Sequence, residues 1–207
     1  NTPIMLGTTD GIVWEGSAEM IDAPAGVPLT YRYGVFLDGQ CSRRESGTMA
    51  HIFCPSKKRN SHYILNDNWK DLPSASHLYS AAFSGDYSLD KTPKDQCTGE
   101  GDIVLRALCP CLHHRKQVLG ICGREEKLGY WNPDRVICME EIQANEWVTT
   151  LSAKDLKFPL EYKFVAVHTE TGKVEEWEMG ANRQLYINDL RKGEIFLTQE
   201  MEVQFES

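Results

Sequence analysis

The chain has 207 residues, of which 41% are hydrophobic and 25% are charged, a composition typical of a globular protein. Its net charge of −8 argues against a nucleic acid or an anionic membrane as partner, because both call for a basic surface. No apolar run reaches the roughly 18 residues that a bilayer-spanning helix needs. Seven cysteines at irregular spacing favour free thiols in a reducing compartment, so we expect a cytoplasmic protein.

Short apolar runs, broken by Gly, Asn, Asp and Pro, recur along the chain, and no long helical stripe of apolar residues is present. The runs occupy residues 11–20, 29–37, 49–53, 101–109, 117–123, 146–153, 160–167, 173–179 and 194–206. Short strands separated by turn residues predict an all-β protein built from immunoglobulin-like β-sandwich modules.

Two parts of the chain resemble each other, which indicates sandwich modules in tandem. Residues 8–36 align with residues 141–167 at a spacing of about 130 residues, close to the size of one domain. Each copy has a Trp-led strand, a loop with Pro and an aromatic–basic–aromatic segment, Tyr31–Tyr33 in one and Tyr162–Phe164 in the other. The first copy begins almost at its Trp strand. We therefore expect a first sandwich truncated at its front, with a partner segment or neighbouring chain covering the exposed edge.

This repeat predicts three regions. Residues 1–58 would be the C-terminal part of a first, degenerate sandwich, and residues 100–207 a complete one. Residues 59–99 lie between them and are polar and rich in turn residues, yet they contain several aromatic side chains that a flexible linker would lack. We expect an ordered connector there, with a short helical turn at 74–83.

The second copy places several unusual side chains close together. Along the strand 160–167 the aromatic side is expected to face the core, so Lys163 points outward, toward the strand that carries Trp177. Trp131 ends a Gly-containing loop, and Asn182 follows a glycine turn. Two indoles, a lysine and an asparagine can therefore converge on one surface.

Such a set of side chains suits a carbohydrate. Flat C–H faces of sugar rings lie against aromatic rings, and sugar hydroxyls need donors and acceptors such as Lys, Asn and Glu. The competing interpretation is that Trp131 and Trp177 are core residues, because indoles are largely buried on average.

Four motifs carry a resemblance to a known family: LGYW (128–131), EWVTTL (146–151), LEYKFVAV (160–167) and EEWEMGANRQL (175–185). Their order and spacing resemble the family 20 starch-binding module. That family is an immunoglobulin-like β-sandwich, so the resemblance implies the same fold over the second copy.

The resemblance also implies a binding site. In that family two tryptophans form the glucan platform, and they correspond to Trp131 and Trp177 here. The family's lysine and asparagine, which bind sugar hydroxyls, correspond to Lys163 and Asn182, with Glu178 beside them. These five residues are the predicted carbohydrate-binding residues.

Other positions depart from the family pattern. Trp147 matches a family tryptophan that we interpret as a core residue. His114 or Arg115 stands where the family usually has a second-site tyrosine, so a second sugar site is not expected. In the first copy Arg32 takes the lysine position and Arg44 takes the position of the second platform tryptophan, which predicts an architectural role for that copy.

Tandem modules joined by such a connector resemble the N-terminal region of two-module 4-α-glucanotransferases. In those enzymes the modules precede a (β/α)₈ catalytic barrel, which needs about 250 residues and does not fit in this chain. The resemblance implies that this chain binds an α-1,4-glucan such as starch, glycogen or a maltooligosaccharide for a catalytic barrel of the same polypeptide. No catalytic residue, cofactor or metal is predicted here.

Three alternatives stay open. The motif CPCLHH (109–114) offers two Cys and two His to zinc, although Cys109 and Cys111 lie too close for a usual zinc finger. A Cys–His nucleophilic enzyme is conceivable, but no cysteine has an activating context such as a Cys-x-x-Cys motif. An immunoglobulin-like protein-interaction module would bind a partner and no glucan.

Overall fold

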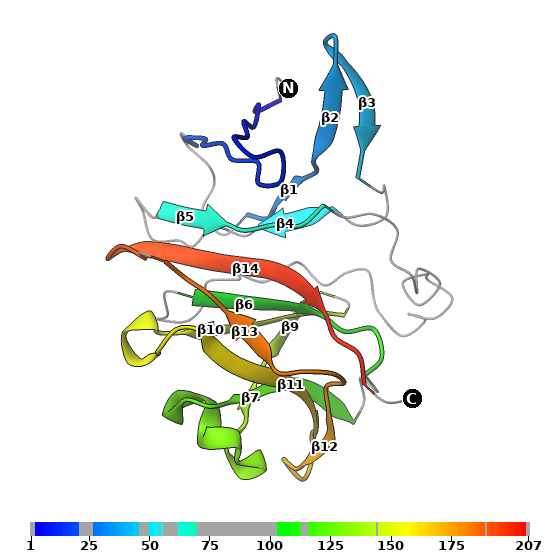
Figure 1. Cartoon of the computed structure of the whole chain (residues 1–207). Helices are drawn as coiled ribbons and strands as arrows, with labels where there is room; N and C mark the ends of the chain where they lie inside the picture. Colours follow the sequence, from blue (N-terminus) through cyan, green and yellow to red (C-terminus); the bar gives the residue numbers. More distant parts are fainter. Residues whose placement is uncertain are drawn as a thin grey trace.

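The structure, a computed structural model, describes most of the chain outside the central connector (Figure 1). The described residues are 3–20, 27–45, 50–53, 55, 62–69, 103–112, 116–143, 145–188 and 190–205. Within them only β-strands and short 3₁₀ helices occur, which confirms the all-β prediction. No helix in this part of the chain is both long and apolar enough to cross a membrane.

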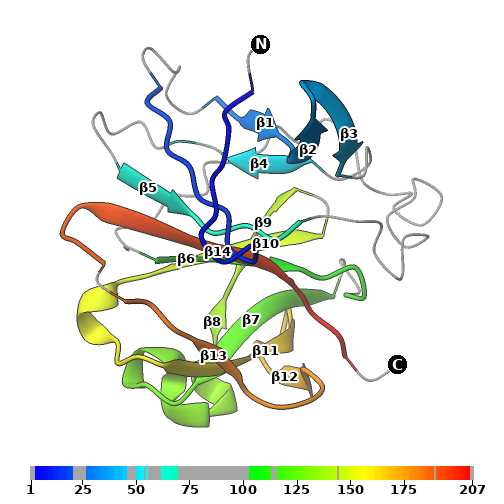
Figure 2. The same cartoon turned by 45° about the horizontal axis from the view of Figure 1, so that its top comes forward.

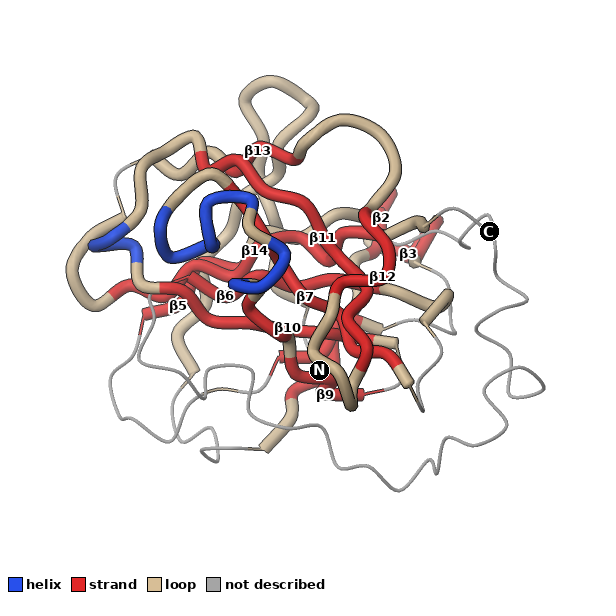
Figure 3. The backbone as a smooth tube through the Cα atoms, turned by 90° about the horizontal axis from the view of Figure 1, so that it is seen from below, coloured by secondary structure: helices blue, strands red, loops and turns tan. Residues whose placement is uncertain are grey.

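Five strands belong to the N-terminal half: β1 (Leu29–Tyr31), β2 (Gly34–Leu37), β3 (Gln40–Arg44), β4 (His51–Phe53) and β5 (His62–Leu65). The later strands are β6 (Ile103–Leu108), β7 (Gln117–Gly123), β8 (Ile137–Cys138), β9 (Glu140–Gln143), β10 (Glu146–Leu151), β11 (Leu160–His168), β12 (Val174–Trp177), β13 (Arg183–Leu185) and β14 (Glu194–Glu202). In the described part of the chain they are accompanied by the short 3₁₀ helices η2 (Glu126–Trp131), η3 (Pro133–Arg135) and η4 (Ala153–Asp155). Figure 3 shows these short helices in blue among the red strands.

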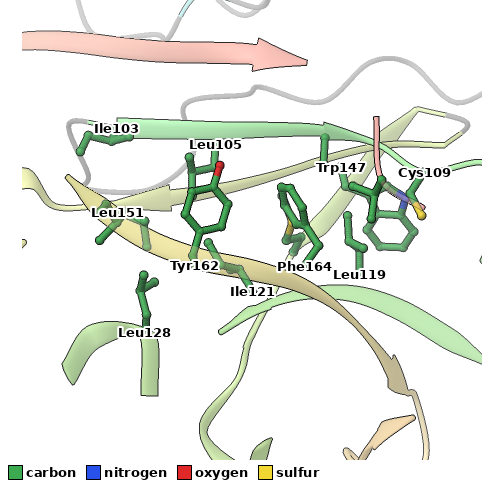
Figure 4. Packing of buried hydrophobic residues seen from close by; sticks show 14 of the residues in the cluster. Ile103, Leu105, Cys109, Leu119, Ile121, Leu128, Trp147, Leu151, Tyr162 and Phe164 are labelled. Carbon is green, nitrogen blue, oxygen red and sulfur yellow. The ribbon is translucent and has the colours of Figure 1, made fainter. Parts of the chain in front are cut away.

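Two sheets pack face to face in the C-terminal half. One has the order β5-β14-β6-β10-β9, and the other has the order β12-β11-β7-β8 with β13 also paired to β11. Buried side chains from both inner faces form the main core (Figure 4). The labelled members of this core are Ile103, Leu105, Cys109, Leu119, Ile121, Leu128, Trp147, Leu151, Tyr162 and Phe164. Trp147 is 4% exposed, which confirms it as a core residue.

Strand β6 is buried on both faces, which explains why all of its residues except Arg106 are apolar. Ile103 and Leu105 face the main core between the two sheets. Val104 faces the opposite way and belongs to a second cluster with Phe53 of β4 and Leu197 of β14. Because side chains alternate along a strand, one strand serves both clusters. Strands β1 and β4 therefore pack on the outer face of the β5-β14-β6 sheet, whereas the β2–β3 hairpin projects away from it (Figure 1).

A buried polar network lies beside this second cluster. Arg106 shares the outer face of β6 with Val104, and its guanidinium lies 2.7 Å from the Asp67 carboxylate. The hydroxyls of Tyr31 and Tyr33 donate to the same carboxylate at 2.6 and 3.0 Å. Burial, reinforced by the Asp67 charge, raises the pKa of both tyrosines above the usual value, so both hydroxyls keep their protons. Asp67 thus joins the N-terminal strands to β6.

The predicted connector 59–99 begins with a strand. Residues 62–65 form β5, which pairs in parallel with β14 from Glu194↔His62 to Leu197↔Leu65 (Figure 2). The sequence did not indicate that this segment extends a sheet of the second half. The expected helical turn at 74–83 lies outside the described residues.

The strand predicted at 11–20 is wrong. The only ladder contact described there is an isolated bridge between Gly7 and Glu15, and Trp14 is 58% exposed. A β-strand needs a neighbour to pair its backbone groups and cover its apolar face. None of the described strands pairs with this segment, so its apolar residues remain on the surface.

The Asp67 network makes a prediction about stability. Replacing Asp67 with Ala leaves the Arg106 guanidinium buried without its carboxylate and should lower the free energy of unfolding by about 3 kcal/mol. Asp134→Ala, at an exposed position, is the matched control and should cost less than about 0.5 kcal/mol. Urea unfolding of both variants checks this. Equal values for the two variants would show that Asp67 does not hold the halves together.

Candidate functional site

A strained loop presents Trp131. Leu128 is buried in the main core and anchors η2 to the sandwich. The next three residues, Gly129, Tyr130 and Trp131, all have left-handed backbones with φ of 83°, 53° and 60°. Two consecutive bulky residues in this conformation cost roughly 1–2 kcal/mol each, and such strain tends to occur at functional sites.

Glycine is required within this loop. A Cβ atom on Gly129 would overlap the carbonyl oxygen of Arg135. The Asn132 amide donates back to the Gly129 carbonyl at 3.0 Å, and the Asn132 side chain accepts from the Asp134 amide at 2.9 Å. The close turn between η2 and η3 therefore fixes the direction of the indole.

Trp177 reaches the same surface from the neighbouring strand. It ends β12, where side chains alternate between half-buried and exposed, and it pairs in register with Val165 of β11. Its indole is 38% exposed. The centroids of the Trp131 and Trp177 rings lie 6.4 Å apart, with the ring planes tilted by 44°. The two indoles thus form one bent aromatic surface.

Lys163 points outward from β11, as the strand alternation requires. Its ammonium donates to the backbone carbonyls of Glu178 at 2.7 Å and Gly180 at 2.6 Å. An ammonium group has three donors, so one N–H remains for a ligand. Gly180 has a φ of 81° and turns the chain back after Trp177.

Asn182 follows that turn and is exposed. Its side-chain amide donates to a carboxylate oxygen of Glu161 at 2.6 Å. This contact orients the side chain and leaves its carbonyl oxygen as an acceptor. Glu161 is itself paired with Arg124, so the contact belongs to a small network at the edge of β11.

Glu178 differs from the sequence prediction. It was expected to reach sugar hydroxyls, yet the residue is 6% exposed and its carboxylate points into the protein. The carboxylate accepts from the Arg183 guanidinium, at 2.9 and 3.0 Å from Nε, and from the Phe164 amide at 3.3 Å. A strand residue next to an outward Trp177 faces inward, so the alternation itself turns the carboxylate away. Glu178 supports the site from below.

The other four predicted residues line one open pocket. Its volume is about 480 Å³, within the usual range for ligand sites, and its walls are Trp131, Lys163, Trp177 and Asn182. These lining side chains provide two apolar ring faces, an ammonium and an amide.

The buried glutamate has a counterpart in the N-terminal strands. The backbone amide of Glu178 donates to the Phe164 carbonyl at 2.9 Å, and the Phe164 amide donates back to the Glu178 carboxylate at 3.3 Å. In the same way, the Glu45 amide donates to the Tyr33 carbonyl at 3.1 Å, and the Tyr33 amide donates to the Glu45 carboxylate at 2.8 Å. The Glu45 carboxylate also lies 3.0 Å from Nε2 of His51, just as the Glu178 carboxylate lies beside Arg183. The sequence did not lead us to predict that Glu45 and Glu178 correspond. A signal was present, because a Glu directly follows Arg44 in the first copy and Trp177 in the second.

The strand pairing matches as well. Strand β11 pairs with β13 at its start and β12 toward its end, and the N-terminal pairs β1–β4 and β2–β3 repeat this arrangement. Arg44 stands immediately before Glu45, as Trp177 stands before Glu178, and its side chain is exposed on β3. The N-terminal strands therefore have an arginine where the C-terminal half has its second indole.

Two sequence interpretations fall partly outside the described residues. Cys109 and Cys111 are described, but His113, His114 and Arg115 are not. Among the residues that the structure describes, no group of three or more His, Cys, Asp or Glu side chains is placed to hold a metal ion. The zinc motif and the second sugar site both involve these undescribed residues.

Comparison with known families agrees with this geometry. Residues 109–196 match the family model described as "Starch binding domain", family 20 of the carbohydrate-binding modules. This segment holds all four lining residues of the pocket. This part of the chain is similar to starch-binding domains, and the match supports carbohydrate binding by it. A search of curated proteins found no match.

Solved structures include three with partial similarity. A family 15 glycoside hydrolase glucoamylase from Hypocrea jecorina is 17% identical over 50% of this chain and 17% of its own length, with a TM-score of 0.41. A γ-CGTase from alkalophilic Bacillus clarkii is 19% identical over 49% of this chain and 15% of its own, at 0.40. The family 20 module of a maltotetraose-forming amylase from Pseudomonas saccharophila is 16% identical over 46% of this chain and 97% of its own, at 0.35. This chain thus spans less than a fifth of the first two proteins.

The strained loop gives a second testable expectation. Gly129→Ala forces a methyl group against the Arg135 carbonyl and should lower the free energy of unfolding by about 3 kcal/mol. Gly172→Ala is the matched control, because Gly172 also has a positive φ but open space around it, and should cost about 1 kcal/mol. Denaturant unfolding followed by fluorescence measures both. A similar loss in the two variants would mean that the loop relaxes easily and does not fix Trp131.

Proposed function

We propose that the pocket between Trp131 and Trp177 binds an α-1,4-linked glucan such as starch, glycogen or a maltooligosaccharide. The observation that carries this proposal is the convergence of two partly exposed indoles, an ammonium and an amide in one pocket. The pocket lies within the segment that matches the starch-binding family. A neutral ligand with flat apolar faces and many hydroxyls complements those four side chains.

The binding mode follows from the geometry. Two consecutive glucose rings stack on the two indoles, and the 44° tilt between the ring planes suits a chain that curves from one unit to the next. Lys163 donates its remaining N–H to a hydroxyl, and the Asn182 carbonyl accepts from another. On the scale of base–aromatic stacking, each ring contributes roughly 1–3 kcal/mol. We therefore expect dissociation constants from about micromolar to millimolar, roughly −8 to −4 kcal/mol.

Glu178 acts in this proposal as a positioning residue. Its carboxylate binds Arg183, whose guanidinium also donates to the Glu202 carbonyl at 2.7 Å. The backbone carbonyl of Glu178 accepts a hydrogen bond from the Lys163 ammonium. Removing the carboxylate would loosen the turn that connects Trp177 to Asn182, although the carboxylate touches no ligand.

We further infer that this chain is the N-terminal part of a cytoplasmic 4-α-glucanotransferase and presents glucan to a catalytic barrel in the same polypeptide. The N-terminal strands would then derive from a first, degenerate starch-binding module with an architectural role. The shared strand pairing and the Glu45–His51 contact, which parallels Glu178–Arg183, support the tandem origin. Arg44 at the platform position supports the loss of sugar binding there.

Titration with maltoheptaose or β-cyclodextrin, followed by tryptophan fluorescence, tests the proposed function. We expect saturation in the micromolar to millimolar range, because a glucan ring covering an indole changes its contact with water. Cellohexaose, whose β-1,4 linkages give a straight chain, should bind at least about tenfold more weakly, a difference of about 1.4 kcal/mol. No response to either α-glucan up to about 10 mM, beyond the weak end of the expected range, would reject sugar binding and favour a protein-interaction module.

Variants locate the site in the same experiment. Trp131→Ala and Trp177→Ala should each weaken binding by about 10- to 100-fold, the equivalent of one lost stacking ring. Trp14→Ala is the matched control, because Trp14 is also exposed but lies in the N-terminal segment. If Trp177→Ala binds as tightly as the unchanged chain, the assigned pocket is wrong.

A further inference from the structure

Glu161 and Lys163 lie two residues apart on the outward face of β11, so both side chains reach the surface that carries the pocket. Lys163 lines the pocket, whereas Glu161 does not. The Glu161 side chain is only 15% exposed, and its carboxylate accepts a hydrogen bond from the side-chain amide of Asn182 at 2.6 Å. Glu161 thus contacts a lining side chain without lining the pocket itself.

Arg124, the residue directly after β7, holds Glu161 from the other side. Its backbone amide donates to the Glu161 carbonyl at 3.0 Å, and its guanidinium is paired with the Glu161 carboxylate. Gly123 permits this close approach, because a Cβ atom on it would overlap the same carbonyl oxygen and also Leu128 of η2. The two carboxylate oxygens have different partners, the Asn182 amide at Oε1 and the Arg124 guanidinium at Oε2. Glu161 is therefore fixed on both sides.

The contact with Glu161 decides which group Asn182 offers to a ligand. A carboxylate only accepts, so the nitrogen of the Asn182 amide has to face Glu161. The carbonyl oxygen on the other branch of the same side chain is then left for the pocket. Because the Lys163 ammonium only donates, the pocket offers one donor and one acceptor. If the Asn182 amide were turned round, both polar groups would be donors.

We propose that Glu161 is a positioning residue, which fixes the Asn182 side chain with its carbonyl oxygen available to the ligand. This inference rests on the proposed glucan binding and concerns the specificity of the same pocket. The ligand has to donate a hydroxyl hydrogen to Asn182 and accept from Lys163, and neighbouring sugar hydroxyls do both. Asn182 is exposed and follows the turn at Gly180, so without Glu161 its side chain would have to be ordered when the ligand binds.

The test measures the binding of maltoheptaose to the full chain by calorimetry. Glu161→Ala should weaken binding by about threefold to tenfold, the cost of immobilising one polar side chain. Because Glu161 acts through Asn182, the double variant Glu161→Ala/Asn182→Ala should bind within about twofold of Asn182→Ala alone. Glu161→Gln keeps an acceptor oxygen and nearly the same shape, so it should recover most of the loss and keeps the test valid if Glu161→Ala fails to fold.

Glu175→Ala is the matched control. The Glu175 carboxylate also accepts from a side-chain amide, that of Gln117 at 2.7 Å, but Gln117 pairs with His168 at the far end of β11. Its removal should change the dissociation constant by less than about twofold. A second readout needs no sugar: the side-chain amide signals of Asn182 in an NMR spectrum of the ligand-free chain should shift in Glu161→Ala and stay in place in Glu175→Ala.

Three outcomes would overturn the proposal. In one, Glu161→Ala binds maltoheptaose as tightly as the unchanged chain. In another, the loss in the double variant is the product of the two single losses, which means that Glu161 acts independently of Asn182. In the third, the Asn182 amide signals do not respond to Glu161→Ala. If the unchanged chain itself binds no maltoheptaose, the proposed function fails instead, and the amide signals alone decide whether Glu161 orients Asn182.

Discussion

The alternation of side chains along β11 is the constraint on which the site depends. Tyr162 and Phe164 face inward and fill the space between the two sheets, so Lys163 between them has to face outward. The same rule turns Trp177 outward at the end of β12, and Glu178, the residue directly after the strand, faces inward. Core and pocket are thus two sides of the same pair of strands. A register slip of one residue would place Lys163 in the core and remove the pocket at once.

Buried carboxylates and their hydrogen-bond partners then hold this arrangement in place. Under the pocket, the Glu178 carboxylate links β11, through the Phe164 amide, to Arg183 on β13. In the N-terminal strands Glu45 plays the equivalent part beside His51. Removing Arg183 leaves the Glu178 carboxylate buried without its countercharge, which costs several kcal/mol. The same local arrangement therefore lies under the pocket in one half and links the N-terminal strands to one another in the other.

Local sequence patterns predicted the features that depend on neighbouring residues in the sequence. They did not predict the features that depend on contacts between distant segments. The strand over 160–167, its outward Lys163 and the two indoles follow from alternation and turn residues. The inward carboxylate of Glu178 depends on Arg183 across a turn and on its position directly after Trp177. The segment 11–20 has the composition of a strand but pairs with none of the described strands, and residues 62–65 became a strand because β14 offers an edge. Composition does not reveal which edge a segment meets.

We propose that a glucan covers the indoles of Trp131 and Trp177, and the tryptophan signals test this directly. The chain has five tryptophans, at positions 14, 69, 131, 147 and 177, and each gives one indole N–H signal in a two-dimensional NMR spectrum. Maltoheptaose should shift the signals of Trp131 and Trp177, and leave the signal of Trp14 unchanged, with assignments made from single Trp→Phe variants. The account is contradicted if saturating maltoheptaose shifts Trp14 or Trp69 while Trp131 and Trp177 stay unchanged.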